Sequence, residues 1–181
     1  MGNPKSSLTI LETDRTILRF QQASDVEFLV DLWSDPEVTR YMGGPRDRGT
    51  LRSGFEETAK DPTAERYVLW PLIDKGSGQP VGHCGLLEKE VEGKTEIELV
   101  YVLVPTAWGK GYATGIGLAL KRYAFGQMSI RRLIALIEPR NTASEKVAVK
   151  IGMRLEKEVT RPGGGIRKMY VIESKDGRAA A

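Results

Sequence analysis

The stretch from Glu96 to Phe125 constrains the fold most, because it shows the pattern of a strand, a glycine turn and a helix in direct succession. Its first part alternates carboxylates with β-branched and apolar residues, which predicts a strand that ends before Pro105. Gly109 and Gly111 follow, and an apolar helical pattern continues from there. The first N–H groups of a helix have no intrahelical partners, and the helix dipole favours negative charge beside them. We therefore expect a phosphorylated ligand at residues 109–114.

The residues of this turn leave the identity of the phosphate ligand open. The chain contains no Gly-x-x-x-x-Gly-Lys-Ser/Thr run, so a P-loop is excluded. The dinucleotide fingerprint Gly-x-Gly-x-x-Gly fits at Gly109 and Gly111, but Thr114 stands in the third glycine's place and Gly115 comes one position late. A nucleotide-dependent oxidoreductase is thus a weaker alternative. The second alternative is that residues 109–114 form an ordinary turn that binds no ligand.

Length and composition favour one soluble domain over residues 1–181, with about 12–173 ordered and short flexible ends. The net charge of +3 is spread along the chain, which argues against nucleic acid as a partner. Cys84 is the single cysteine, so an internal disulfide is impossible, and this fits a reducing compartment. No apolar run approaches the roughly 20 residues of a membrane span. We expect a cytoplasmic protein, and with His83 as its only histidine we expect no metal site.

The order of predicted elements is mixed, which indicates an α+β fold rather than a doubly wound sheet. Short polar turns join three strands into an antiparallel meander that ends in the strand after Glu96, with residues 88–94 as a charged loop. Ser24 is the expected N-cap of the first helix, and Asn141 or Thr142 that of the last. The predicted strands, besides the one at Glu96, are Thr16–Phe20, Arg66–Asp74, Pro80–Leu87, Arg132–Ile137, Leu155–Thr160 and Lys168–Ile172, and a further helix is expected over Asp47–Ala59.

Four separated segments carry a family resemblance over about residues 12–171. Trp108-Gly-Lys-Gly-Tyr-Ala-Thr114 resembles the acetyl-CoA pyrophosphate loop of the GNAT N-acetyltransferase superfamily, in the branch that acetylates N-terminal residues of ribosomal proteins. Asn141-Thr-Ala-Ser144 with Lys150-Ile-Gly152 resembles a later segment of that branch. Thr13–Arg19 and Leu32–Arg40 are similar to its opening.

The resemblance implies the GNAT fold, a mixed and mostly antiparallel sheet of about six to seven strands flanked by helices and splayed at its two central strands. It implies acetyl-CoA as the donor, no metal, and an acceptor site bordered by the loop Tyr41–Arg46. The cofactor-binding residues it points to are Val102, Val104, Trp108, Gly109, Lys110, Gly111, Tyr112, Ala113, Thr114, Asn141, Ser144 and Lys150.

Acetyl transfer to an amine needs a base for the ammonium proton, a donor that stabilises the oxyanion, and a proton for the departing thiolate. The resemblance assigns the base to Glu98, although a carboxylate there could equally lie on a solvated strand face. It makes Ser144 the proton donor, although a serine at a helix N-terminus is also an ordinary cap. Tyr170 is the alternative acid.

These observations predict an acetyl-CoA-dependent N-acetyltransferase that works by direct attack in a ternary complex. The acceptor is either a protein N-terminus or a small-molecule amine, and the protein is a monomer or a homodimer. A non-catalytic acyl-CoA-binding sensor stays open as an alternative, because Val100 and Gly115 replace the glycine and glutamate that relatives often carry.

Overall fold

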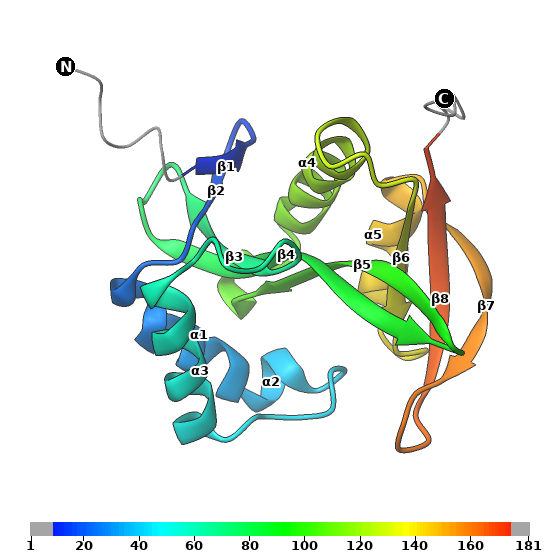
Figure 1. Cartoon of the computed structure of the whole chain (residues 1–181), viewed down its shortest axis with the longest axis horizontal. Coiled ribbons are helices and arrows are strands. Elements are labelled where there is room, and N and C mark those ends of the chain that lie inside the picture. Colours follow the sequence, from blue (N-terminus) through cyan, green and yellow to red (C-terminus); the bar gives the residue numbers. More distant parts are fainter. Residues whose placement is uncertain (1–8, 175–181) are drawn as a thin grey trace.

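One eight-stranded sheet organises the protein, and the computed structural model describes residues 9–174 (Figure 1). Its strand order is β1-β2-β3-β4-β5-β6-β8-β7, and only the β5–β6 pair is parallel. The predicted α+β class is therefore confirmed. The strands are β1 (Thr9–Glu12), β2 (Thr16–Arg19), β3 (Leu69–Asp74), β4 (Pro80–Val91), β5 (Lys94–Leu103), β6 (Arg132–Ile137), β7 (Arg154–Thr160) and β8 (Ile166–Glu173).

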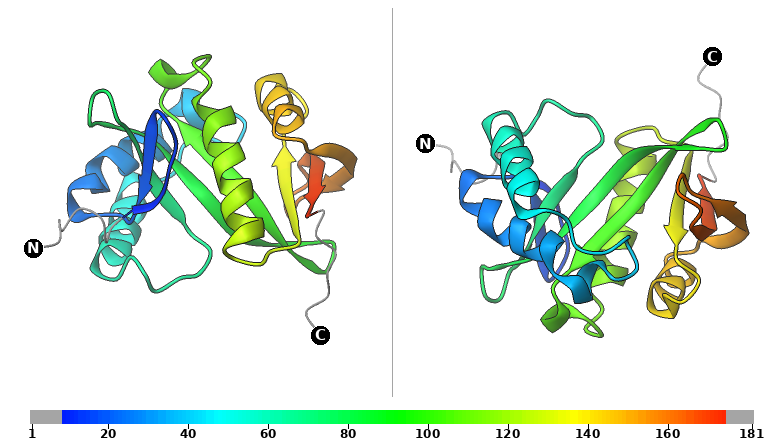
Figure 2. Two further views of the ribbon diagram at one scale, coloured as in Figure 1. Left: turned by 90° about the horizontal axis from the view of Figure 1, so that it is seen from above. Right: turned by 90° about the horizontal axis from the view of Figure 1, so that it is seen from below.

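Two groups of helices cover opposite faces of the sheet (Figure 2). The first group packs on β3, β4 and β5 through an apolar cluster that includes Leu32, Trp33, Leu69 and Val102. The second group packs on the other face over the main core, which includes Leu86, Leu99, Ile116 and Leu133. The first group is α1 (Val26–Ser34), α2 (Pro36–Thr39) and α3 (Arg48–Lys60), and the second is α4 (Tyr112–Gly126) and α5 (Thr142–Lys150).

The predicted charged loop at 88–94 is wrong, because β4 continues to Val91 and turns into β5 at Glu92 and Gly93. Exposed Glu88 and Glu90 alternate with half-buried Lys89 and buried Val91, and Val91 packs among side chains of β6, β7 and β8. The count of strands is eight rather than six to seven, since the short edge strand β1 was not expected.

The expected cap at Ser24 is also wrong. A short 3₁₀ turn over Ala23–Asp25 precedes α1, and Asp25 makes the local bonds instead. Its buried carboxylate accepts from the backbone N–H of Gln22 at 2.7 Å and pairs with Arg19 at 2.7 and 2.8 Å. This doubly hydrogen-bonded ion pair fixes the helix start more strongly than a serine hydroxyl could.

The sheet splays between its two central strands, as the resemblance implied. β5 and β6 share one ladder pair, Glu98 with Ile134, whereas β4 pairs with β5 along nearly its whole length. Beyond that pair the Glu98 carboxylate accepts from the backbone N–H of Leu136 at 3.2 Å. A side chain thus replaces the next ladder bond, and the strands diverge from there. No helix within residues 9–174 is long and apolar enough to cross a membrane.

A buried polar chain joins α1 to the sheet through His83. Trp33 Nε1 donates to His83 Nδ1 at 3.0 Å, and His83 Nε2 lies 3.0 Å from the carbonyl oxygen of Leu69. Nδ1 therefore acts as an acceptor, and the imidazole is neutral. Burial lowers the pKa of His83 to about 4.

This lowered pKa predicts acid sensitivity of the fold. Between pH 6.5 and 4 the unfolded chain binds a proton at His83 that the native protein does not, so the free energy of unfolding falls as the pH falls. We expect protonation linked to His83 to lower the free energy of unfolding by about 2 kcal/mol between pH 7.5 and pH 5. Urea unfolding of the wild type and of His83→Asn measures this, and the variant should be less stable at pH 7.5 but show a flatter pH dependence. Equal slopes in the two proteins would refute the assignment.

Candidate active site

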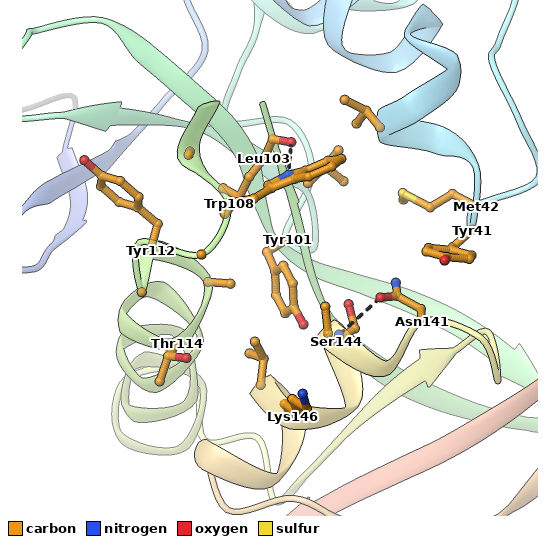
Figure 3. Close-up of a pocket in the computed structure, with 18 of the residues that line it drawn as sticks. Tyr41, Met42, Tyr101, Leu103, Trp108, Tyr112, Thr114, Asn141, Ser144 and Lys146 are labelled. Atoms are coloured by element: carbon orange, nitrogen blue, oxygen red, sulfur yellow. Dashed lines mark hydrogen bonds between the residues drawn. The ribbon is translucent and has the colours of Figure 1, made fainter. Parts of the chain in front are cut away.

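A cleft of about 350 Å³ opens at the splay between β5 and β6 (Figure 3). Its walls come from four separate parts of the chain: the segment through α2, the end of β5, the glycine turn with the start of α4, and α5. Of the cofactor residues predicted from the sequence, the structure brings ten together here, namely Val102, Trp108, Gly109, Gly111, Tyr112, Ala113, Thr114, Asn141, Ser144 and Lys150. Val104 and Lys110 do not line it.

The glycine turn presents backbone and an indole ring to this cleft. Gly109 and Gly111 have φ values of +70° and +81°, a conformation that side chains with a Cβ rarely adopt, and α4 begins directly after them. Trp108 Nε1 donates to the carbonyl oxygen of Leu103 at 2.9 Å, yet the residue is still 38% exposed. A large ring held rigidly and left uncovered is a surface suited to a ligand.

Side chains from distant segments of the chain hold the glycine turn in place. The Arg15 guanidinium donates to the carbonyl oxygen of Lys110 at 2.6 Å and lies 4.2 Å from the centre of the Tyr112 ring. The Tyr112 hydroxyl in turn donates to Asp74 at 2.6 Å, and this bond is the main cause that lowers the pKa of Asp74. Lys110 thus contributes its carbonyl to the bracing. The cations that do line the cleft are Arg40, Lys146 and Lys150.

The start of α5 forms the opposite wall. Asn141 caps this helix, as predicted, because its Oδ1 accepts from the backbone N–H of Ser144 at 3.2 Å. The amide nitrogen of the same side chain points away from the helix (Figure 3). Tyr101, which sequence reasoning did not single out, points from β5 toward Ser144 (Figure 3). Burial raises the pKa of Tyr101 to about 12, with the nearby Ser144 hydroxyl acting in the opposite direction, so both hydroxyls carry protons at neutral pH.

A smaller cavity of about 100 Å³ continues the cleft into the splay and contains Glu98. The two cavities share Tyr41, Met42, Tyr101, Asn141 and Ser144. Burial raises the pKa of Glu98, although Lys89, the Leu136 N–H and the charges of Arg161 and Arg167 oppose the shift. Only one oxygen of Glu98 accepts from Leu136, which leaves the carboxylate with further lone pairs. Glu98 and Ser144 therefore meet at one continuous space.

The structure does not bring Tyr170 to this space. Tyr170 lies on β8, is 7% exposed, and packs within the main core near Glu145 and Lys168 of the α5 side. It lines neither cavity. Within residues 9–174, no group of three or more His, Cys, Asp or Glu side chains is arranged to hold a metal ion.

Comparisons with known proteins agree with this geometry. The sequence profile of the acetyltransferase (GNAT) domain family matches residues 15–154. The uncharacterized protein YkkB of Bacillus subtilis (strain 168) is 33% identical over 154 residues, which cover 84% of this chain and 90% of YkkB.

Two solved structures show the same architecture. An acetyltransferase of the GNAT family from Bacillus anthracis has a TM-score of 0.75 and 26% identity, and the match covers 90% of this chain and 97% of that one. AAC(6′)-Ib in complex with paromomycin and acetyl-CoA has a TM-score of 0.71 at 18% identity, covers 93% of this chain and 100% of that one, and shows the likeness of the fold alone. The resemblance to the GNAT superfamily inferred from the four sequence segments is thereby confirmed at the level of the family, and the chain belongs to the GNAT acetyltransferase family.

Proposed function

We propose that this protein transfers an acetyl group from acetyl-CoA to a primary amine by direct attack in a ternary complex. The observation that carries the proposal is the continuous cleft, in which the glycine turn at one end opens onto Glu98 at the other. The pyrophosphate binds at the N–H groups of the turn and the first residues of α4, where unpaired donors and the helix dipole favour negative charge. Lys146 and Lys150 add positive charge along the same wall.

The side chains around the splay supply the proton transfers. Glu98 accepts a proton from the ammonium form of the acceptor, directly or through a water, and the freed amine attacks the thioester carbonyl carbon. The C–S bond of the tetrahedral intermediate then breaks, and the electron pair leaves on sulfur as a thiolate. The Ser144 hydroxyl, with the Tyr101 hydroxyl beside it, gives the proton that converts this thiolate to free CoA. The nitrogen that attacked loses its extra proton as the amide forms, and this proton restores the hydroxyl.

Calorimetric titration with acetyl-CoA tests the proposal, with NADH as the control ligand. We expect acetyl-CoA to bind in the micromolar range and NADH not to bind. Amines added to the complex should then release the CoA thiol. Binding of acetyl-CoA with no amine-dependent release across a broad panel of amines and N-terminal peptides would contradict the enzyme and favour an acyl-CoA sensor. Binding of NADH alone would favour the oxidoreductase.

Gly111→Ala tests the contribution of the turn itself. A Cβ at Gly111 would meet no atom within 4 Å, so the substitution acts only through the backbone, which a non-glycine residue strains at this φ. The strain costs about 1 kcal/mol or more, and we expect roughly tenfold weaker acetyl-CoA binding by calorimetry. Gly115→Ala is the matched control, since its Cβ also meets no atom within 4 Å but its φ is an ordinary helical one. Equal affinities for the two variants would show that the shape of the turn does not matter.

A further inference from the structure

The register of the strands shows which side chains share a face with Glu98. Glu98 pairs with Ile134, so the two side chains project on the same side of the sheet. Ile134 belongs to an apolar cluster with Val159 of β7 and Met169 of β8. This is also the side on which α1, α2 and α3 pack, since Leu87, opposite Glu98, contacts their cluster. Those helices stop at β5, and beyond it the side chains of this face are buried together with Val91 from the end of β4.

Two arginines of the β7–β8 hairpin stand on this face. Arg161 comes two residues after Val159 and Arg167 two residues before Met169, so strand alternation directs both side chains to the Glu98 side. The turn between them projects on the side of α1–α3 (Figure 1) and is closed by a bond from Arg161 N–H to the Gly165 carbonyl at 2.9 Å. The Arg167 guanidinium donates to the Ile166 carbonyl at 2.8 Å, which limits its motion.

A third arginine, Arg46, lies close enough to Arg161 for the two charges to repel each other. Arg46 lies in the segment after Tyr41 and Met42, which line both cavities. Its backbone N–H donates to the Trp33 carbonyl at 3.2 Å, and its guanidinium lies 4.3 Å from the centre of the Trp33 ring. The ring is itself fixed by its bond to His83. Arg46 is therefore held in position without any anionic partner.

The positive charge of this arginine trio, Arg46, Arg161 and Arg167, is only partly offset by nearby carboxylates. Within residues 9–174, none of the three forms an ion pair with a carboxylate. Glu138, which attracts Arg167, already pairs with Arg140 at 2.8 Å. Burial and then repulsion from Arg161 lower the pKa of both Arg46 and Arg167. Arg161 repels both of the other arginines, and Glu98 attracts Arg167. The single charge of Glu98 leaves the trio with an excess of positive charge, which a bound anion would balance.

We infer that the arginine trio binds an anionic group of the acceptor, so that the acceptor is a small amine that also carries a carboxylate or a phosphate group. The inference rests on the proposed function and deepens it. Guanidinium groups bind both kinds of anion through paired N–H donors. Arg161 and Arg167 lie close enough to Glu98 to act on its charge, and Arg161 acts likewise on Arg46. An anion bound by the trio therefore brings the amine of the same molecule near the base. The cavity beside Glu98, about 100 Å³, suits a small molecule.

Matched amines test this inference. Propylamine, β-alanine and 2-aminoethylphosphonate are small primary amines that differ in whether they carry no anion, a carboxylate or a phosphonate. We expect kcat/KM for at least one anionic amine to exceed that for propylamine tenfold or more. In Arg161→Gln/Arg167→Gln, and in Arg46→Gln, the advantage should fall at least tenfold. The control Arg122→Gln/Arg131→Gln removes the same charge from exposed positions elsewhere and should keep the wild-type preference. Because Arg161 and Arg167 repel each other, the double variant at these two positions should melt no lower than the wild type.

Direct binding separates failure of this inference from failure of the proposed function. Calorimetry without acetyl-CoA should show binding of the preferred anionic amine to the wild type and at least tenfold weaker binding to the trio variants. Arg-dependent binding without any acetyl transfer would overturn the proposed function and leave the anion site standing. Transfer to propylamine as fast as to either anionic amine would overturn the anion site and leave the function standing. Transfer only to peptides that begin with an acidic residue would overturn the assignment of a small acceptor.

Discussion

Gly85→Ala is expected to destabilise the protein by about 3 kcal/mol or more. Gly85 lies in β4 opposite Leu69, at the start of β3, where the two paired strands approach closely. A Cβ at Gly85 would overlap the Val68 carbonyl oxygen and lie 3.0 Å from the Leu69 Cα. Both obstacles are backbone atoms of a central strand pair, so neither can swing away as a side chain would. Relief requires the two strands to separate, which breaks ladder bonds in the middle of the sheet. Urea unfolding measures the loss.

Gly54→Ala provides the control for this experiment. Gly54 lies within α3 on an exposed surface, and a Cβ there would meet no atom within 4 Å. Alanine is the better helix former, so we expect this variant to gain about 0.5–1 kcal/mol. The same chemical change should therefore act in opposite directions at the two sites. A Gly85→Ala protein as stable as the wild type would mean that β3 and β4 do not approach each other at Gly85 as closely as described.

Glu98→Gln is expected to lower kcat by about 100-fold or more while leaving acetyl-CoA affinity unchanged. Glutamine keeps the shape of the side chain and can still accept from the Leu136 N–H, but it cannot take a proton from the acceptor. Because burial raises the pKa of Glu98, the wild-type rate should fall as the pH drops through a value above 4.5, where the carboxylate becomes protonated. Steady-state rates across pH 5–9 measure both effects, and the acid limb should disappear in the variant.

Glu96→Gln is the matched control, because Glu96 lies two residues earlier on the same face of β5 and pairs with Arg132 at 3.1 Å. Its loss should affect stability and leave turnover near the wild-type value. A purely structural Glu98, acting only as the substitute for a ladder bond at the splay, predicts instead that the two variants have equal rates and the same pH profile. That result would end the assignment of Glu98 as the base.

The sequence alone predicted those parts of the site whose structure depends on neighbouring residues in the chain. Two glycines followed by an apolar helix predicted the turn at Gly109 and Gly111, and the cap at Asn141 was visible in the sequence because a capping side chain contacts its own helix. The strands of the meander were predicted from alternation. The order of β6, β8 and β7 was not predicted, since it depends on which strand edges meet.

The residues that sequence reasoning missed are those whose roles depend on distant parts of the chain. In the sequence Tyr101 looks like an ordinary aromatic residue of a strand. Only the fold shows that its hydroxyl points toward Ser144 of α5. The arginine trio comes from two segments that are more than 100 residues apart, and no local pattern connects them. Tyr170 shows the reverse case, because the strand register places this predicted acid in the core, away from both cavities, and no local pattern reveals that placement.

The single ladder pair between β5 and β6 also bears on how this sheet avoids aggregation. An unpaired strand edge is normally a template on which another chain can add a strand, and proteins cover or interrupt such edges. Beyond Glu98 the open edges of β5 and β6 face each other across a gap inside the molecule. A second polypeptide cannot lie along them, whereas a slender molecule with its own amide groups can. The backbone N–H and C=O groups of β5 and β6 that are unpaired at the centre of the sheet are thus accessible only to a narrow ligand.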